Sequence, residues 1–133
     1  MFWAFLIIVG CSGVEPGGAP VTLVRAVGSI GPIRNCLKVA GGLYSQDKLD
    51  VAVTQVNTCY EEHFTPLEAL LREHNSRATL SLEYGFGTLA VSMGQPNSGA
   101  DTQAEQLADR LEAVIDSIAA SESPQSTELA PEN

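Results

Sequence analysis

Three cysteines are the side chains of this 133-residue sequence best suited to covalent chemistry, and they stand at positions 11, 36 and 59. A thiol can be acylated, can be oxidised to a disulfide, or can bind a metal as the thiolate. Which of these applies depends on the neighbouring residues and on the redox state of the compartment. Two histidines, at positions 63 and 74, are the other candidate metal ligands.

Cys11 follows a short apolar segment at the amino terminus. Residues 1 to 9 read MFWAFLIIV, and Gly10 separates them from the cysteine. A helix needs roughly 20 apolar residues to cross a bilayer, whereas the apolar part of a signal peptide needs about 7 to 15. We therefore expect residues 1 to 10 to be a signal peptide. No Lys or Arg precedes the apolar run, so its positive charge would be that of the amino terminus alone.

The four residues Ile8-Val9-Gly10-Cys11 resemble the lipobox of bacterial lipoproteins. The resemblance implies cleavage before Cys11, a diacylglyceryl group on its thiol, and a fatty acyl group such as palmitate on the new amino terminus. Two or three acyl chains anchor a protein firmly, whereas one anchors it marginally. Ser12 implies the outer rather than the inner membrane, and residues 11 to 20 would form the lipidated start and a Gly/Pro-rich linker. The alternative is that Cys11 is a small residue in a buried or processed segment.

A lipidated Cys11 leaves Cys36 and Cys59 as an even pair in an exported chain. Such a pair is typical of a disulfide, because the compartments outside the cytosol are oxidising. Closing the 22 intervening residues would stabilise the fold by about 3 kcal/mol. Two buried free thiols, or a metal pair with His63, are the alternatives. A zinc site is disfavoured because no CxxC motif and no obvious third or fourth ligand accompany them.

The motifs of the common enzyme classes are missing from the sequence. It contains no G-x-S-x-G elbow, no H-E-x-x-H helix and no phosphate-binding glycine loop. Adjacent carboxylates such as Glu61 and Glu62 diverge on a helix, so they do not form an acid/base couple. His63 and His74 would stand roughly 16 Å apart along one helix, too far to share a metal. We predict no enzyme activity, no cofactor and no metal.

The net charge of −9 arises from sixteen acidic and seven basic residues, and the basic residues are scattered. Nucleic acids and anionic membrane surfaces require clustered Lys and Arg. We therefore expect no nucleic-acid partner and no polybasic contact with a membrane.

Helical spacing of apolar residues occurs in several segments. A helix is expected from Pro32 to the pair Gly41-Gly42, another over residues 47 to 63, and a third from Pro66 to about His74 behind a capping box at Thr65. The second carries an apolar stripe of Leu49, Ala52, Val53, Val56, Cys59 and Tyr60. A last helix begins near Asp101 and ends near Ala120, with Leu107, Leu111, Val114, Ile115 and Ile118 on one face and Glu105, Asp109, Glu112 and Asp116 on the other.

Strands are expected in two places. Residues 21 to 27, VTLVRAV, have the composition of a short strand, and residues 78 to 94 alternate in polarity on both sides of Gly85-Phe86-Gly87. The second pattern predicts a β-hairpin with the Gly-Phe-Gly sequence as its turn. The sequence thus predicts a single α+β domain over residues 21 to 120, with three to four helices packed on a short antiparallel sheet. Residues 121 to 133 are expected to be a disordered tail.

These features favour a non-enzymatic, membrane-anchored lipoprotein that serves as an accessory or structural subunit of a cell-envelope complex. Its domain would face the periplasm or the exterior and contact an envelope protein. The alternative is a periplasmic module that binds a small ligand or cation through the hairpin and the acidic last helix, although no calcium loop is present. An enzyme with an unfamiliar site is a third hypothesis.

Overall fold

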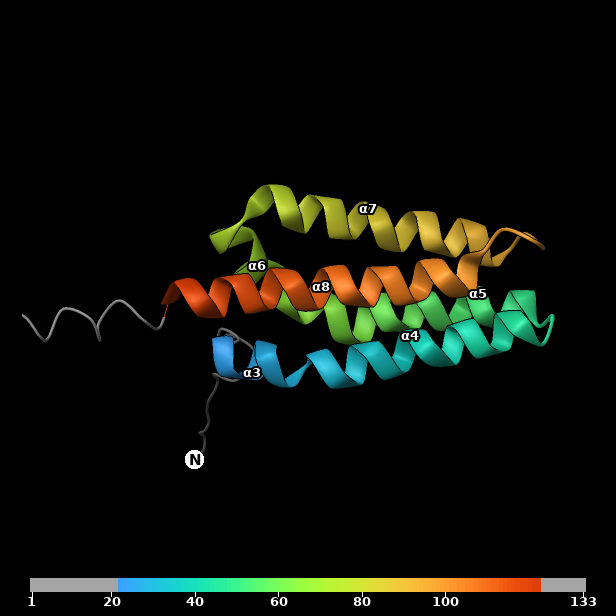
Figure 1. Cartoon of the computed structure of the whole chain (residues 1–133), viewed down its shortest axis with the longest axis horizontal. Coiled ribbons are helices and arrows are strands. Elements are labelled where there is room, and N and C mark those ends of the chain that lie inside the picture. Colours follow the sequence, from blue (N-terminus) through green and yellow to red (C-terminus); the bar gives the residue numbers. More distant parts are fainter. Residues whose placement is uncertain (1–21, 123–133) are drawn as a thin grey trace, which may run out of the picture.

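Helices form all the regular structure of residues 22 to 122, the part of the chain that the computed structural model describes (Figure 1). The predicted signal peptide, Cys11, the linker up to residue 20 and residues 123 to 133 of the tail lie outside the described residues. The order is α3 (Leu23–Gly28), α4 (Ile30–Ser45), α5 (Leu49–Thr58), a π-helix η1 (Cys59–Phe64), a 3-10 helix η2 (Thr65–Leu67), α6 (Glu68–His74), α7 (Ser76–Met93) and α8 (Ala100–Glu122).

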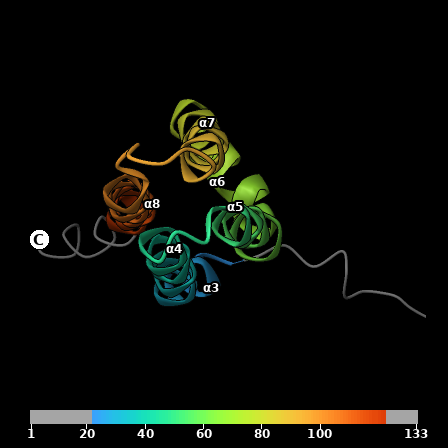
Figure 2. The same ribbon diagram turned by 90° about the vertical axis from the view of Figure 1, so that its right-hand side faces the viewer.

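The four long helices α4, α5, α7 and α8 run alternately up and down, and they form a square in cross-section (Figure 2). Each packs against its two neighbours in this square, and α8 closes it by packing against α4. The connections from α4 to α5 and from α7 to α8 are short, which favours an antiparallel arrangement of these successive helices. The described part of the chain is therefore a helical bundle.

Apolar stripes with helical spacing build the core of the bundle. In α8 the buried side chains follow the predicted face, and in α5 Ala52 and Val56 point inward as expected. In α7 the buried residues recur after three and four positions alternately, which is the spacing of one helix face. They are Thr79, Leu82, Phe86, Leu89 and Met93.

The predicted α+β class and its β-hairpin are wrong, because residues 76 to 93 form the single helix α7. The alternation at Leu80, Leu82 and Tyr84 suggested a strand, yet Leu80 is 65% exposed and Tyr84 is 77% exposed. Phe86, which the hairpin placed in the turn, is a core residue with 2% of its surface exposed. Two helical glycines each cost about 1 kcal/mol, and the packing of α7 against α5 and α8 overrides this preference.

Two further segments differ from the predictions. Residues 23 to 28 form helix α3, not a strand, and Thr22 caps it by accepting a hydrogen bond from the backbone N–H of Arg25. Helix α4 continues through Gly41-Gly42 to Ser45, because Gly41 lies against α8. A Cβ at Gly41 would lie 3.6 Å from the Cα of Asp101, which is ordinary van der Waals contact, so α4 and α8 pack against each other here and an added methyl group would fit.

Gly85 lies closer to its neighbours, between α7 and α8. A Cβ atom there would lie 2.8 Å from Cδ1 of Leu107 and 3.2 Å from Nη1 of Arg110. By contrast, a Cβ at Gly87 would meet nothing within 4 Å. Of the two glycines that suggested a turn, Gly85 therefore lies in a close contact between α7 and α8, and Gly87 lies at an open position on the outer side of α7.

The end of the bundle opposite α3 is held by Tyr44 of α4. Its hydroxyl donates to the carbonyl of Gln95 at 3.0 Å and accepts from the backbone N–H of Ser98 at 2.8 Å. These bonds fix the loop between α7 and α8. The loop contains two residues with positive φ, Asn97 and Gly99, that reverse the chain direction.

Alanine substitution of two aromatic residues distinguishes the helix from a hairpin. We expect Phe86→Ala to lower the free energy of unfolding by about 3 to 5 kcal/mol, because it empties a core position. Tyr84→Ala should change it by less than about 0.5 kcal/mol, because the side chain is exposed. Urea unfolding at low protein concentration measures both, and a larger loss for Tyr84→Ala would contradict the helical fold.

Candidate functional site: a disulfide and a charged groove on α4

Cys36 and Cys59, which the sequence suggested as a pair, lie together in the structure. Their sulfur atoms are bonded, and their Cα atoms are 5.8 Å apart, within the usual Cα–Cα range for a disulfide. Cys36 lies in the middle of α4, and Cys59 is the first residue of η1, directly after α5. The bond therefore links two antiparallel helices that are also neighbours in the sequence.

The disulfide is buried and is contacted by a polar side chain. Cys59 is completely buried, and Cys36 is 8% exposed. The Nε2 atom of Gln55 donates to the carbonyl of Cys36 at 3.4 Å and contacts its sulfur at 3.3 Å. This amide shields the bond on its more exposed side. Neither histidine is near the pair in any described contact, so the arrangement differs from the metal pair considered for His63.

The π-helix η1 begins at the disulfide cysteine, directly continues α5, and carries part of an aromatic cluster. The rings of Tyr60, Phe64 and Phe86 are 5.1 to 5.5 Å apart between centroids, a favourable range for aromatic contacts. Short π segments widen a helix by one residue per turn. Both Tyr60 and Phe64 of η1 contact Phe86 of α7.

Tyr60 also forms the one polar contact of this cluster. Its hydroxyl donates to Oε2 of Glu68 at 2.8 Å. The hydrogen bond to Glu68, together with burial, raises the pKa of Tyr60 to about 12. The phenol therefore stays protonated at neutral pH and holds α6 against η1, which is a structural rather than a catalytic role.

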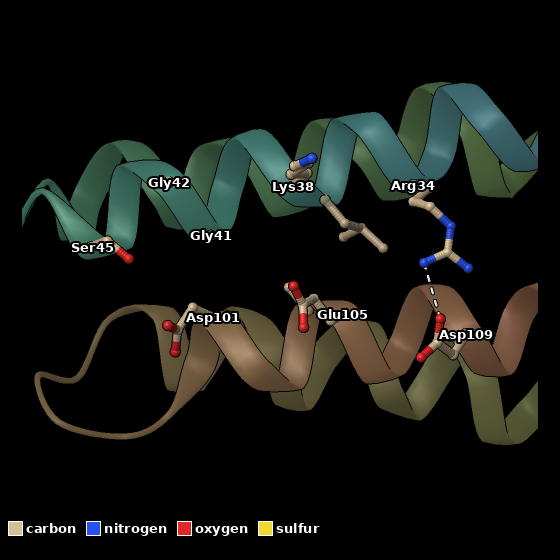
Figure 3. A pocket seen from close by; sticks show the side chains of 10 residues that line it. Arg34, Lys38, Gly41, Gly42, Ser45, Asp101, Glu105 and Asp109 are labelled. Carbon is tan, nitrogen blue, oxygen red and sulfur yellow. Dashed lines mark ion pairs between the residues drawn. The ribbon is translucent and has the colours of Figure 1, made fainter.

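A groove of about 450 Å³ separates α4 from α8 on the surface (Figure 3). Its floor consists of small or apolar residues, and charged side chains from both helices form its rim. Glu105 and Asp109 extend from α8 toward α4. The lining residues are Arg34, Leu37, Lys38, Gly41, Gly42, Ser45, Asp101, Ala104, Glu105 and Asp109.

Arg34 forms ion pairs with two of the acidic residues on α8. Its guanidinium lies 2.9 Å from Oδ1 of Asp109 and also forms an ion pair with Glu112. These two bonds, the one to Glu112 above all, raise the pKa of Arg34. The acidic face predicted for α8 is therefore partly a helix-to-helix contact. Lys38, Asp101 and Glu105 form no ion pair within the described residues.

The two histidines lie on separate elements, His63 in η1 and His74 at the end of α6. His74 contacts the carboxylate of Glu122 at 2.9 Å through Nε2 and the carbonyl of Leu70 at 3.0 Å through Nδ1. It therefore ties α6 to the last turn of α8. Within residues 22 to 122, no three His, Cys, Asp or Glu side chains gather in a way that could hold a metal ion.

Sequence reasoning missed the contacts that join distant segments. Arg34 was treated as one of several scattered basic residues, although it joins α4 to α8 across a separation of more than 70 residues. Phe86 was assigned to a turn. In its case a signal existed, because Leu82, Phe86, Leu89 and Met93 have helical spacing.

No family model matches this chain, and no curated protein or solved structure is significantly similar to it. Among the helices of residues 22 to 122, none has both the length and the apolar character that a membrane span requires.

Reduction of the disulfide should destabilise the bundle. In the chain-entropy picture, opening a loop of this length costs about 3 kcal/mol, and Cys36→Ser with Cys59→Ser should lower the free energy of unfolding by a similar amount. Urea unfolding with and without reductant tests this, and the double variant is the control that must not respond to reductant. An identical midpoint for the native chain in both conditions would contradict a formed disulfide.

The His74 contact predicts a pH dependence of stability. Its hydrogen bond to the Leu70 carbonyl and its contact with Glu122 raise the pKa of His74 above the ordinary 6.5. A group whose pKa is raised by folding stabilises the folded state fully at pH values below its unfolded pKa. This stabilisation is lost as the pH rises through the folded pKa. The free energy of unfolding should therefore fall above about pH 6.5.

The variant His74→Gln should remove this component of the pH profile, measured by urea unfolding between about pH 5 and 9. His63→Gln is the matched control, because His63 has no ion pair among the described residues, and it should keep the profile. A native profile in His74→Gln would refute the assignment.

Proposed function

We propose that this chain is a lipid-anchored accessory or structural subunit of a bacterial cell-envelope complex, held to the outer membrane by acyl groups on Cys11. Its helical domain would face the periplasm or the exterior, and its partners would be envelope proteins. In this role the domain supplies a rigid shape rather than a reaction.

The pairing of Cys36 with Cys59 is the observation that carries the proposal. The chain has three cysteines, so a disulfide between these two leaves Cys11 as the one thiol free for acylation. A buried disulfide is also typical of proteins in oxidising compartments, to which a signal peptide would send the chain. The disulfide and the lipobox-like sequence thus both support an extracytoplasmic location, each through a different chemical property.

Several polar groups of the bundle hold helices together. Tyr60 binds Glu68, Arg34 binds two carboxylates on α8, and His74 binds Glu122. Groups committed to such contacts stabilise the orientation of helices. This pattern favours a structural role over the alternative of a small-ligand or cation-binding module, since Arg34 already occupies two of the acids that such a site would use.

The position of α3 fits a tether at one end of the bundle. The described chain begins at Thr22, next to the end of the bundle where α8 finishes (Figure 1). The ten residues between Cys11 and Thr22 could span at most about 36 Å. The anchor would thus hold this end near the membrane, and the opposite end, with the loop before Ala100, would extend toward a partner.

Labelling of the full-length chain with palmitate in a bacterial host tests the anchor. We expect the native chain to incorporate the label and to partition into detergent, because Cys11 is acylated. Cys11→Ser should incorporate none, whereas Ser12→Ala, a change of the adjacent residue, should remain labelled. A native chain without label, or equal labelling of Cys11→Ser, would refute the proposal.

A further inference from the structure

The outer side of α7 carries a stripe of residues that are largely exposed. Leu80, Tyr84, Gly87 and Val91 follow one another after four, three and four positions, so they lie on one face. Leu80, Tyr84 and Val91 are each more than 60% exposed. This face is opposite the buried residues of α7. We call these four residues the α7 stripe.

A hollow of about 230 Å³ lies beside the stripe, between α7 and α5. It exists because Gly87 has no side chain and nothing lies within 4 Å of where its Cβ would be. The other lining residues are Val56, Asn57, Tyr60, Glu83 and Phe86. An exposed aromatic ring could lie across Gly87 and enter this hollow, where it would contact the edge of the aromatic cluster.

Three of the four stripe residues, Tyr84, Gly87 and Val91, lie in a long uncharged part of a strongly acidic chain. From Tyr84 to Ala100 there is no Asp, Glu, Lys, Arg or His, although the whole chain carries a net charge of −9. Two copies of such a chain repel each other across most of their surfaces. They can approach most closely where no carboxylate faces the partner, and the α7 stripe meets this condition.

We propose that the α7 stripe binds the same stripe of a second copy of this chain, with the two helices antiparallel. A two-fold axis midway between residues 85 and 86 places Leu80 against Val91 of the second copy and Tyr84 against its Gly87. A symmetric interface of this kind requires a self-complementary surface, in which every contact between two positions occurs twice. The stripe satisfies this requirement, because its two large aliphatic side chains meet each other and the ring of Tyr84 meets the position without a side chain, Gly87.

The same register also avoids repulsion between charged residues. Glu83 falls beside Thr88 of the second copy, and Arg77 falls beside Gly94, so no two like charges face each other. The two copies of Arg77 lie about 26 Å apart along the helices. Arg72, which pairs with Glu83 in the same chain, leaves the edge of the hollow neutral.

Three apolar side chains on one helix bury less surface than the roughly 800 Å² per partner of a stable complex. The dimer is therefore weak and reversible in solution. Sedimentation equilibrium of the purified full chain in density-matched detergent, between roughly 1 µM and 1 mM, should show the protein mass rising toward twice that of one chain. Mass of a single chain at every concentration would overturn the proposal.

Variants of the stripe test its involvement. Tyr84→Glu places a charge at the centre of the interface and should keep the chain monomeric throughout the range. Val51→Glu is the matched control on an exposed position of α5, and it should dimerise like the native chain. A dimer that persists in Tyr84→Glu forms through another surface, such as the apolar amino-terminal segment, and would overturn the proposal.

Cross-linking tests the register. An equal mixture of Leu80→Cys chains and Val91→Cys chains should form disulfide-linked dimers on mild oxidation, because the two positions meet across the axis. Either variant alone should form at least tenfold less, since its own two copies lie about 16 Å apart. Equal cross-linking of the single variants and the mixture would contradict the antiparallel arrangement.

Discussion

The bond between Cys36 and Cys59 is the constraint on which the rest of the structure depends most. It ties the middle of α4 to the point where α5 becomes a π-helix, so that the first two long helices form one covalently closed unit. The π-helix then directs Tyr60 and Phe64 toward α7, and their contact with Phe86 sets the position of that helix. Helix α8 completes the square against this unit.

The same bond connects the fold with the proposed location of the protein. A small domain gains most from a covalent link, because its core is limited. Such a link persists in an oxidising compartment. It also consumes two of the three thiols, which leaves Cys11 for the lipid that the lipobox-like sequence implies. The proposed stability of the domain and its proposed attachment to the membrane thus depend on the same assignment, in which Cys36 and Cys59 form the disulfide and Cys11 carries the lipid.

How much of this fold the sequence could predict depended on the range of the interactions. The helix stripes of residues 49 to 60 and 107 to 118 were predicted, because helix period is a local property. Residues 78 to 94 were not, since a period of two at Leu80, Leu82 and Tyr84 competed with a period of 3.6 through Leu82 and Phe86. Burial decided between them, and burial depends on α5 and α8, which lie elsewhere in the sequence.

The candidate site follows the same division. The cysteine pair could be suggested from parity and compartment, without knowledge of the fold. The groove on α4 could not, because it arises where Gly41 packs against α8 and where Arg34 meets Asp109 and Glu112. Nor could the hollow at Gly87, since a glycine in a helix was interpreted as part of a turn. The groove and the hollow are both formed between helices that are far apart in the sequence, so local sequence patterns do not predict them.

The intact mass of the protein extracted from membranes, alkylated without prior reduction, tests the central claim most directly. The account predicts a chain that begins at Cys11, carries acyl groups on that residue, lacks two hydrogens, and accepts alkyl groups on Cys36 and Cys59 only after reduction. A chain that retains residues 1 to 10, carries no acyl group and is alkylated at all three cysteines without reductant would contradict it.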